Sequence, residues 1–135
     1  MLSAVIATHE SERALVPTLA ALVPGATAGL LREVIVADVG SQDATVEIAD
    51  IAGCRLVVMQ GTTGARLTAA AKTARGPWLM FVPPGLVLDA NWVDATGEFL
   101  NTQAEDGDTE RAATFRRISA GSIPAARHCC CLMAR

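Results

Sequence analysis

The sequence predicts an α/β domain built on a mostly parallel four-stranded sheet. Short apolar runs rich in β-branched residues alternate with stretches of helical period, which is the pattern of βαβ units. The chain has 135 residues, enough for one domain with its own core. Hydrophobic residues make up 51% of the chain and charged residues 19%, a balance that favours a folded domain over a disordered one.

The first strand is expected at residues 2–8, an apolar run that ends at Thr8. A helix follows, beginning near Ser11 or Val16 and ending at Val23. Both starts stay open because Pro17 lacks an N–H and is tolerated best in the first turn of a helix. The apolar face of this helix comprises Leu15, Leu19, Leu22 and Val23.

The second βα unit is expected to follow directly. Residues 33–38 form its strand, because Val-Ile-Val is a buried core run, and Asp43 can cap a helix over residues 44–52 that stops at Gly53. A helical crossover of this kind joins parallel strands. The first two strands should therefore be parallel neighbours.

Two further strands are expected at residues 54–59 and 78–82. A glycine-containing turn at 61–64 and an Ala-rich helix at 65–75 connect them, and Gly76 and Pro77 close that helix. The order of elements is again strand, helix, strand, which completes the four-stranded sheet.

After the fourth strand, Pro83-Pro84-Gly85 breaks the chain and Asp89 can cap a last helix. The apolar stripe of that helix comprises Trp92, Thr96, Phe99 and Leu100. Residues 101–110 are polar and are expected to form a loop. The domain is assigned to residues 1–115, and residues 116–135, which show no clear period, to an irregular C-terminal tail.

Charge and composition argue against several classes of function. The formal net charge is −3 and no block of Lys and Arg occurs, so nucleic acid is not an expected partner. The uncharged stretch at 14–31 is Ala-rich and interrupted by Pro and Gly, so no transmembrane segment is expected. With no signal-peptide pattern, and no disulfide or CxxC spacing among the four cysteines, a cytoplasmic location is expected.

Ligands of parallel α/β sheets bind beyond the carboxyl ends of the strands, where loops and helix N-termini present free N–H groups. No GxGxxG pattern follows the first strand and no GxxxxGK(S/T) motif occurs, so the common dinucleotide and P-loop sites are not expected. The four strand ends carry Thr8-His9-Glu10, Asp38-Val39-Gly40-Ser41-Gln42-Asp43, Gln60-Gly61-Thr62-Thr63-Gly64 and Pro83-Pro84-Gly85.

Two of these segments resemble glycosyltransferase family 2. They are Val5-Ile6-Ala7-Thr8 followed by Glu10 or Glu12, and Glu33-Val34-Ile35-Val36-Ala37-Asp38-Val39-Gly40-Ser41-Gln42-Asp43-Ala44-Thr45. In that family the first strand ends in a Pro-Thr-like pair and the second in an Asp, Gly, Ser, x, Asp, Gly, Thr pattern. Here Ala7 replaces the proline and Ala44 a glycine. The resemblance covers roughly the first hundred residues in order.

The resemblance implies the nucleotide-binding half of a GT-A fold, a three-layer, Rossmann-like arrangement. It also implies that Thr8 and Asp38 lie around the nucleobase, with Asp38 accepting a hydrogen bond from a uracil-type ring N–H, and that Glu10 is a further nucleotide-binding residue. The alternative is that Asp38 only caps the turn after its strand. On the binding hypothesis, Asp38→Ala weakens nucleotide binding and leaves the fold intact. Ser41 and Asp43 are expected only to shape the loop.

Gly64 and Arg66 lie where the resemblance places a glycine-containing turn and a helix N-terminus near the phosphates of a sugar nucleotide. Backbone N–H groups and the helix dipole favour an anion there. Arg66 could pair with a pyrophosphate, or it could be a solvated arginine in the first turn of a surface helix. The sequence leaves these two interpretations equally open.

The fourth strand departs from the family pattern. Members usually carry an acidic pair there that holds Mn²⁺ or Mg²⁺, whereas this chain has Val82-Pro83-Pro84-Gly85, which offers no side-chain oxygen to a hard cation. Asp89 is the nearest carboxylate in sequence. We therefore assign no metal ligand and no catalytic residue, and leave open whether Mn²⁺ or Mg²⁺ binds.

Transfer of a sugar from a nucleoside-diphosphate donor to a hydroxyl acceptor is the function that the resemblance implies. The alternative is a non-catalytic nucleotide-binding or interaction module derived from the same fold. Fold and activity are separate claims, because activity depends on the residues of the site.

Overall fold

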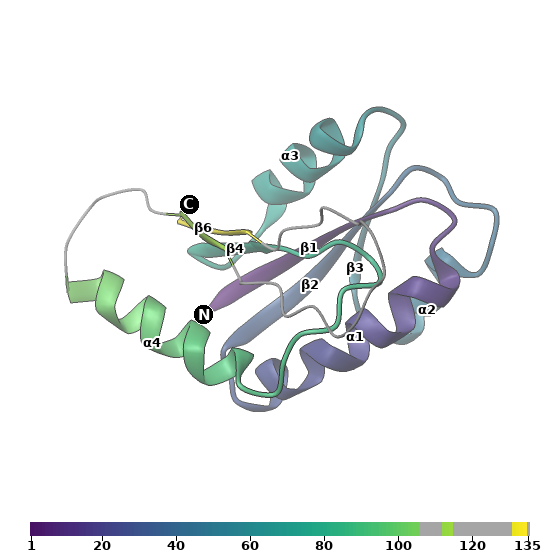
Figure 1. Ribbon diagram of the computed structural model, residues 1–135. Helices are drawn as coiled ribbons and strands as arrows, with labels where there is room; N and C mark the ends of the chain where they lie inside the picture. Colours follow the sequence, from purple (N-terminus) through teal and green to yellow (C-terminus); the bar gives the residue numbers. More distant parts are fainter. Residues whose placement is uncertain (106–111, 115–130, 135) are drawn as a thin grey trace, which may run out of the picture.

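The computed structural model describes residues 1–105, 112–114 and 131–134. A central sheet lies between two helical layers (Figure 1), with α1, α2 and α4 on one face and α3 on the other. In chain order the elements are β1 (Leu2–Thr8), α1 (Glu12–Thr27), β2 (Leu31–Asp38), α2 (Thr45–Ile51), β3 (Arg55–Val58), α3 (Thr63–Thr73), β4 (Trp78–Phe81), α4 (Trp92–Glu105), β5 (Ala112–Thr114) and β6 (Cys131–Ala134).

The described strands form one sheet in the order β3-β2-β1-β4-β6-β5. The first four strands of this order are parallel to one another, while β6 pairs antiparallel with both β4 and β5. The predicted three-layer α/β fold with a four-stranded parallel sheet is confirmed. Two short antiparallel strands extend the sheet beyond β4.

Strand β1 is buried on both faces because helices cover both sides of the sheet. Leu2, Ala4 and Ile6 pack into the core beneath α1 and α4. Val5 points the other way, into a smaller core that includes Ala70 of α3. Because successive side chains point to opposite faces of the sheet, the single apolar run of β1 contributes residues to both cores.

Helix α1 is longer than predicted, since it continues through Pro24 to Thr27. Val23, expected on its apolar face, is 58% exposed. The extension is held by packing: a Cβ at Gly25 would lie 2.2 Å from the ring of Trp92, and the indole N–H of Trp92 donates to the carbonyl of Ala21 at 3.0 Å. The Trp92 ring thus fastens α4 to the last turns of α1.

The predicted loop at 101–110 is wrong for residues 101–105, which continue helix α4. Leu100 is the last buried residue of the predicted stripe, and a polar continuation of a surface helix is fully compatible with helical structure. Residues 106–110 lie outside the described part of the chain.

The predicted irregular tail is likewise wrong for Cys131–Ala134, which form β6. Their strand conformation comes from pairing with Trp78–Phe81 of β4, a partner about fifty residues earlier, and such pairing leaves no periodic signal in a four-residue segment. Residues 116–130 and 135 lie outside the described residues, so the domain boundary at 115 stays a prediction.

Candidate functional site

The candidate site lies at the carboxyl end of the parallel strands. Thr8 and Asp38 are the last residues of β1 and β2 and are partners in the register of the two strands. The hydroxyl of Thr8 donates to Oδ1 of Asp38 at 2.6 Å, and both residues are buried. The two side chains thus meet at one edge of the sheet, and their predicted place around a nucleobase stays a prediction.

The carboxylate of Asp38 is fully engaged by the protein. Its Oδ2 accepts the N–H groups of Gly40 and Ser41 at 2.7 and 2.6 Å, and its Oδ1 also accepts the Ser41 hydroxyl at 2.7 Å. Burial raises the pKa of Asp38, but the hydrogen bonds from Thr8, Ser41 and Gly40 outweigh it and leave the pKa below its ordinary value. In this conformation Asp38 anchors the loop after β2, and its contact with a base stays a prediction.

Two loops at this edge are joined to each other. Glu10 follows β1 with a left-handed backbone, φ 47°, and donates its N–H to the hydroxyl of Ser41 at 2.9 Å. Its Oε1 accepts the N–H of Gln42 at 2.6 Å. The exposed Glu10 therefore links the β1 loop to the β2 loop, and its predicted role in nucleotide binding is not tested by these contacts.

A second pair of reciprocal bonds lies at the starts of α1 and α2. Asp43 accepts the N–H of Glu12 at 3.1 Å, and Glu12 accepts the N–H of Ala44 at 3.1 Å. The hydroxyl of Thr45 donates to Asp43, and this bond is the main reason why the pKa of Asp43 is lowered. Asp43 and Ser41 shape the loop, as the sequence predicts, although the N-cap of α2 is Ala44.

Arg66 is buried, with 6% of its surface exposed. One guanidinium nitrogen donates to the main-chain carbonyls of Thr8 at 2.5 Å and Ala37 at 3.0 Å, so the side chain spans the ends of β1 and β2. Its Nε is buried and has no acceptor among the described residues, and no described carboxylate forms an ion pair with Arg66. The solvated surface arginine considered from the sequence is therefore wrong.

Gly64 lies inside α3 as its second residue, where the sequence placed it in a turn. Thr62 is the N-cap, and its hydroxyl accepts the N–H of Ala65 at 3.2 Å. A Cβ at Gly64 would meet nothing within 4 Å. The first turn of α3 therefore presents open main chain, with the N–H groups of Thr63 and Gly64 lacking acceptors among the described residues.

A pocket of about 410 Å³ lies between the ends of β1 and β4. The helices that follow β1 and β3 cover opposite faces of the sheet (Figure 1), so this is the point where the topology reverses direction and where α/β sheets bind ligands. The residues lining the pocket are Ala7, Thr8, His9, Ser11, Thr63, Arg66, Leu67, Phe81, Val82, Pro83 and Pro84. None of these is acidic, and Arg66 is the permanent cation among them.

The pocket brings together only part of the predicted site. Thr8 and Arg66 line it, whereas Asp38, Glu10 and Gly64 do not. Phe81 and Leu67 contribute apolar surface that the sequence analysis did not assign to a site. The sequence could have indicated Phe81, because it ends a buried strand at the edge of the sheet where ligands of α/β folds bind.

The loop after β4 is fastened to α1. Gly85 has φ +89° and donates its N–H to the carbonyl of Ala14 at 3.1 Å and to the hydroxyl of Thr18 at 2.9 Å. Asp89, expected to cap α4 with its side chain, accepts the N–H of Trp92 with its main-chain carbonyl. Within the described part of the chain, no group of three His, Cys, Asp or Glu residues is placed to hold a metal ion.

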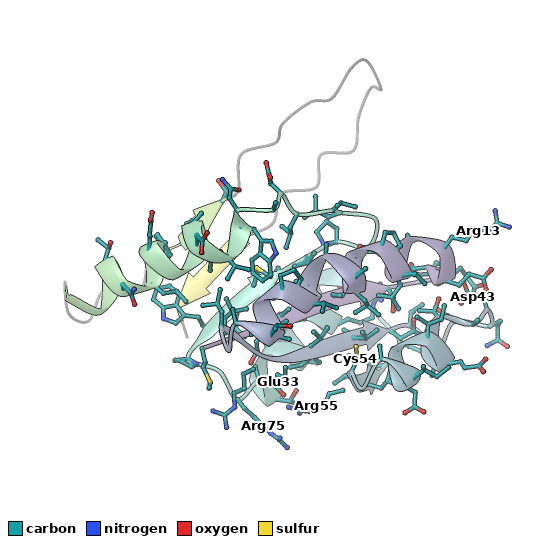
Figure 2. The ribbon with its side chains drawn as sticks, turned by 90° about the horizontal axis from the view of Figure 1, so that it is seen from below. Arg13, Glu33, Asp43, Cys54, Arg55 and Arg75 are labelled. Atoms are coloured by element: carbon teal, nitrogen blue, oxygen red, sulfur yellow. The ribbon has the colours of Figure 1, made fainter. Side chains whose placement is uncertain are left out.

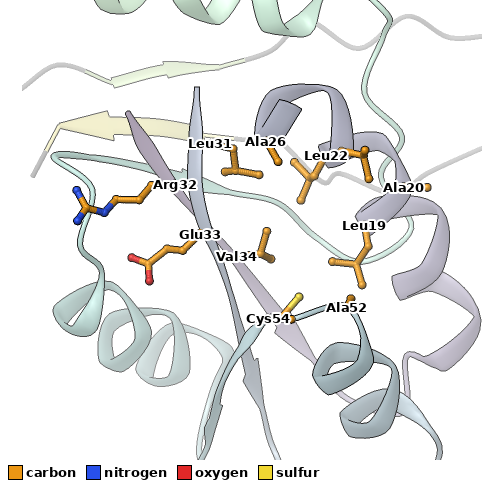
Figure 3. A pocket seen from close by; sticks show the side chains of 12 residues that line it. Leu19, Ala20, Leu22, Ala26, Leu31, Arg32, Glu33, Val34, Ala52 and Cys54 are labelled. Atoms are coloured by element: carbon orange, nitrogen blue, oxygen red, sulfur yellow. The ribbon is translucent and has the colours of Figure 1, made fainter. Parts of the chain in front are cut away.

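A second pocket of about 380 Å³ lies at the opposite, amino end of β2, between α1 and the end of α2 (Figure 3). Aliphatic side chains such as Leu19, Leu22 and Val34 line most of it, and Arg32 and Glu33 are its charged residues. It lies away from the convergent loops and helix N-termini, so we do not assign the ligand site there.

The family is shown by the sequence itself. A model of "Glycosyl transferase family 2" matches residues 3–111, and the chain belongs to this family. No curated protein matches the chain. None of the described helices is long and apolar enough to cross a membrane.

Solved structures share the fold. Staphylococcus aureus TarS superposes with a TM-score of 0.71 at 20% identity, covering 93% of this chain and 23% of TarS. Its fragment 1-349 gives 0.68 at 20% identity, covering 92% and 38%. Mycobacterium tuberculosis glucosyl-3-phosphoglycerate synthase gives 0.58 at 24% identity, covering 64% of this chain and 34% of that one. The chain thus spans less than two-fifths of the length of each of these structures.

Proposed function

We propose that the chain binds a nucleoside diphosphate and its sugar conjugate in the pocket between β1 and β4, as the donor-binding part of a glycosyltransferase. The observation that carries this proposal is Arg66, a buried cation with an unpartnered Nε and no carboxylate partner among the described residues, lining that pocket. A buried charge without a counter-ion is costly. An anionic ligand would offset that cost.

Family membership and the known ligands of similar structures support a diphosphate as the anion. TarS 1-349 has been solved in complex with UDP, and glucosyl-3-phosphoglycerate synthase with UDP-glucose and Mn²⁺. In sugar transfer, a hydroxyl oxygen of the acceptor bonds to the anomeric carbon while the bond to the diphosphate breaks and the diphosphate leaves with the electron pair. The hydroxyl proton passes to a base or to solvent. Arg66 would stabilise the negative charge that develops on the leaving group.

Calorimetric titration of the full chain with UDP, GDP and ADP, and with uridine, guanosine and adenosine, tests the binding proposal. We expect at least one diphosphate to bind about tenfold or more tightly than its nucleoside, because the anion supplies the contact with Arg66. Arg66→Gln should lose this difference, and its thermal unfolding is measured in parallel because Arg66 also bonds to Thr8 and Ala37. Failure of every diphosphate to bind, with and without Mn²⁺, would contradict the proposal.

A non-catalytic binding module remains the rival function, because fold and turnover are separate properties. The two are distinguished by release of UDP from a UDP-sugar in the presence of hydroxyl acceptors. Release that depends on the acceptor indicates a transferase. Tight binding without release indicates a module.

A further inference from the structure

The carboxylates at the candidate site are already used by the protein. Asp38 accepts four hydrogen bonds, two of them from the main chain, and has no exposed surface. Glu10, Glu12 and Asp43 accept main-chain N–H groups that hold the β1 and β2 loops together. A hard cation needs free oxygen ligands. Recruiting the bonded oxygens would break the bonds that shape the edge, and none of these four carboxylates lines the pocket.

The strand end where family 2 resemblance implies Mn²⁺ or Mg²⁺ does not fit such an ion either. Residues 82–85 read Val, Pro, Pro and Gly, and Pro83 and Pro84 line the pocket with apolar ring carbons. The main chain of Gly85 is turned toward α1 by its bonds to Ala14 and Thr18. The donor set at this edge is therefore wrong for a divalent cation.

The same edge is well supplied with donors for an anion. Arg66 and Thr63 line the pocket, and Arg66 has no carboxylate partner among the described residues. At the start of α3, the N–H groups of Thr63 and of Gly64, which follows it outside the lining, have no acceptor within the described part of the chain. Open space lies above Gly64, so main chain and ligand can approach closely. Helix N-termini favour negative charge through these N–H groups and the helix dipole.

We propose that the pocket holds the phosphates of its ligand without a divalent cation, on Arg66 and the first turn of α3. The proposal rests on the proposed function, since it concerns the same pocket and the same nucleoside diphosphate. The protein supplies here the positive charge that a metal would bring, so binding requires no metal.

Titration of UDP, GDP and ADP into the full chain in EDTA and in excess Mn²⁺ tests this. For the diphosphate that binds, we expect binding in EDTA at least as tight as in Mn²⁺, because excess Mn²⁺ complexes the free diphosphate in solution. Binding only in Mn²⁺ would overturn metal independence and leave the proposed function standing. Absence of binding in both buffers would overturn the proposed function and this inference with it.

Gly64→Asp tests the place of the phosphate. An Asp in the first turn interacts favourably with the helix dipole, so the melting temperature should be preserved or raised. Its carboxylate repels the ligand's phosphate. We expect affinity to fall about tenfold or more in EDTA. Gly97→Asp is the matched control, because it makes the same change on α4, where a Cβ also meets nothing within 4 Å. Equal affinities of the two variants would contradict the assigned place.

Discussion

At each end of β2 a carboxylate accepts hydrogen bonds from neighbouring segments, but among the described residues only the carboxylate at the amino end is paired with an arginine. Glu33 near the start of the strand accepts a hydroxyl from β1, that of Ser3, and a main-chain N–H, that of Arg75. Asp38 at the other end accepts the Thr8 hydroxyl and two main-chain N–H groups. Each carboxylate thereby joins β1, β2 and a neighbouring segment.

The two ends differ in where the guanidinium goes. At the amino end, Arg55 forms an ion pair with Glu33 at 2.7 Å, and the two lie together with Arg75 in Figure 2. At the carboxyl end, Arg66 bonds to main-chain carbonyls and leaves Asp38 to neutral donors. At the amino end, the ion pair with Arg55 neutralises the charge of Glu33. At the carboxyl end, Arg66 lies beside a pocket and has no carboxylate partner in the described part of the chain, and this difference separates a structural clamp from the proposed binding site.

The largest expected effect is on stability, from Asp38→Asn. The amide nitrogen of the introduced Asn cannot accept a hydrogen bond, so N–H or O–H groups that now donate to one carboxylate oxygen lose their acceptor. We expect a loss of about 3 kcal/mol or more in the free energy of unfolding, measured by urea denaturation. This replaces the sequence-based expectation of an intact fold with weakened binding. A loss below about 0.5 kcal/mol would show that the carboxylate is not the anchor.

Glu33→Gln should cost less, about 1–2 kcal/mol, because its side chain is partly exposed and solvent can replace a lost partner. Arg55→Gln should cost under about 1 kcal/mol, since Arg55 is 35% exposed and exposed ion pairs are weak. Urea denaturation of both variants and of Asp38→Asn ranks the two ends of β2 by the loss in the free energy of unfolding. A larger loss for Arg55→Gln than for Asp38→Asn would reverse the comparison.

Both carboxylates should make stability depend on pH in the same direction. Burial raises the pKa of Glu33, but bonds from Arg75, Arg55 and Ser3 outweigh it, so its pKa, like that of Asp38, is lowered. A lowered pKa stabilises the fold above the ordinary value, and this stability is lost as pH falls below about 4.5. Unfolding measured from pH 7 to 3 should show this loss, and a flat profile in the wild type would contradict it.

The sequence predicts the fold well because its signals are local. Strand runs such as Val34-Ile35-Val36 and the stripe from Trp92 to Leu100 depend on residues close in the chain. The meeting of Thr8 and Asp38 follows from two parallel strands that end at the same edge. Strand β6 was missed because its conformation depends on β4, a distant partner.

The role of Arg66 could not be predicted, because its acceptors are main-chain carbonyls 58 and 29 residues away. Any residue type at positions 8 and 37 presents such a carbonyl, so side-chain identity gives no signal. The engagement of Asp38 was partly visible, since Gly40 and Ser41 follow it directly in the motif. That both oxygens are used became clear only from the positions of the loop N–H groups.

A prediction that leaves stability unchanged concerns Cys54, which lines the apolar pocket at the amino end (Figure 3). Burial raises the pKa of its thiol to about 11, so the thiolate that reacts with iodoacetamide is scarce at pH 7. We expect alkylation of Cys54 about a hundredfold slower in the folded chain than in urea. Trypsin cleavage after Arg32 and Arg55 isolates this thiol from the other cysteines for mass spectrometry. Equal rates in the two conditions would show that the amino end offers a reactive group and is less closed than its charge balance indicates.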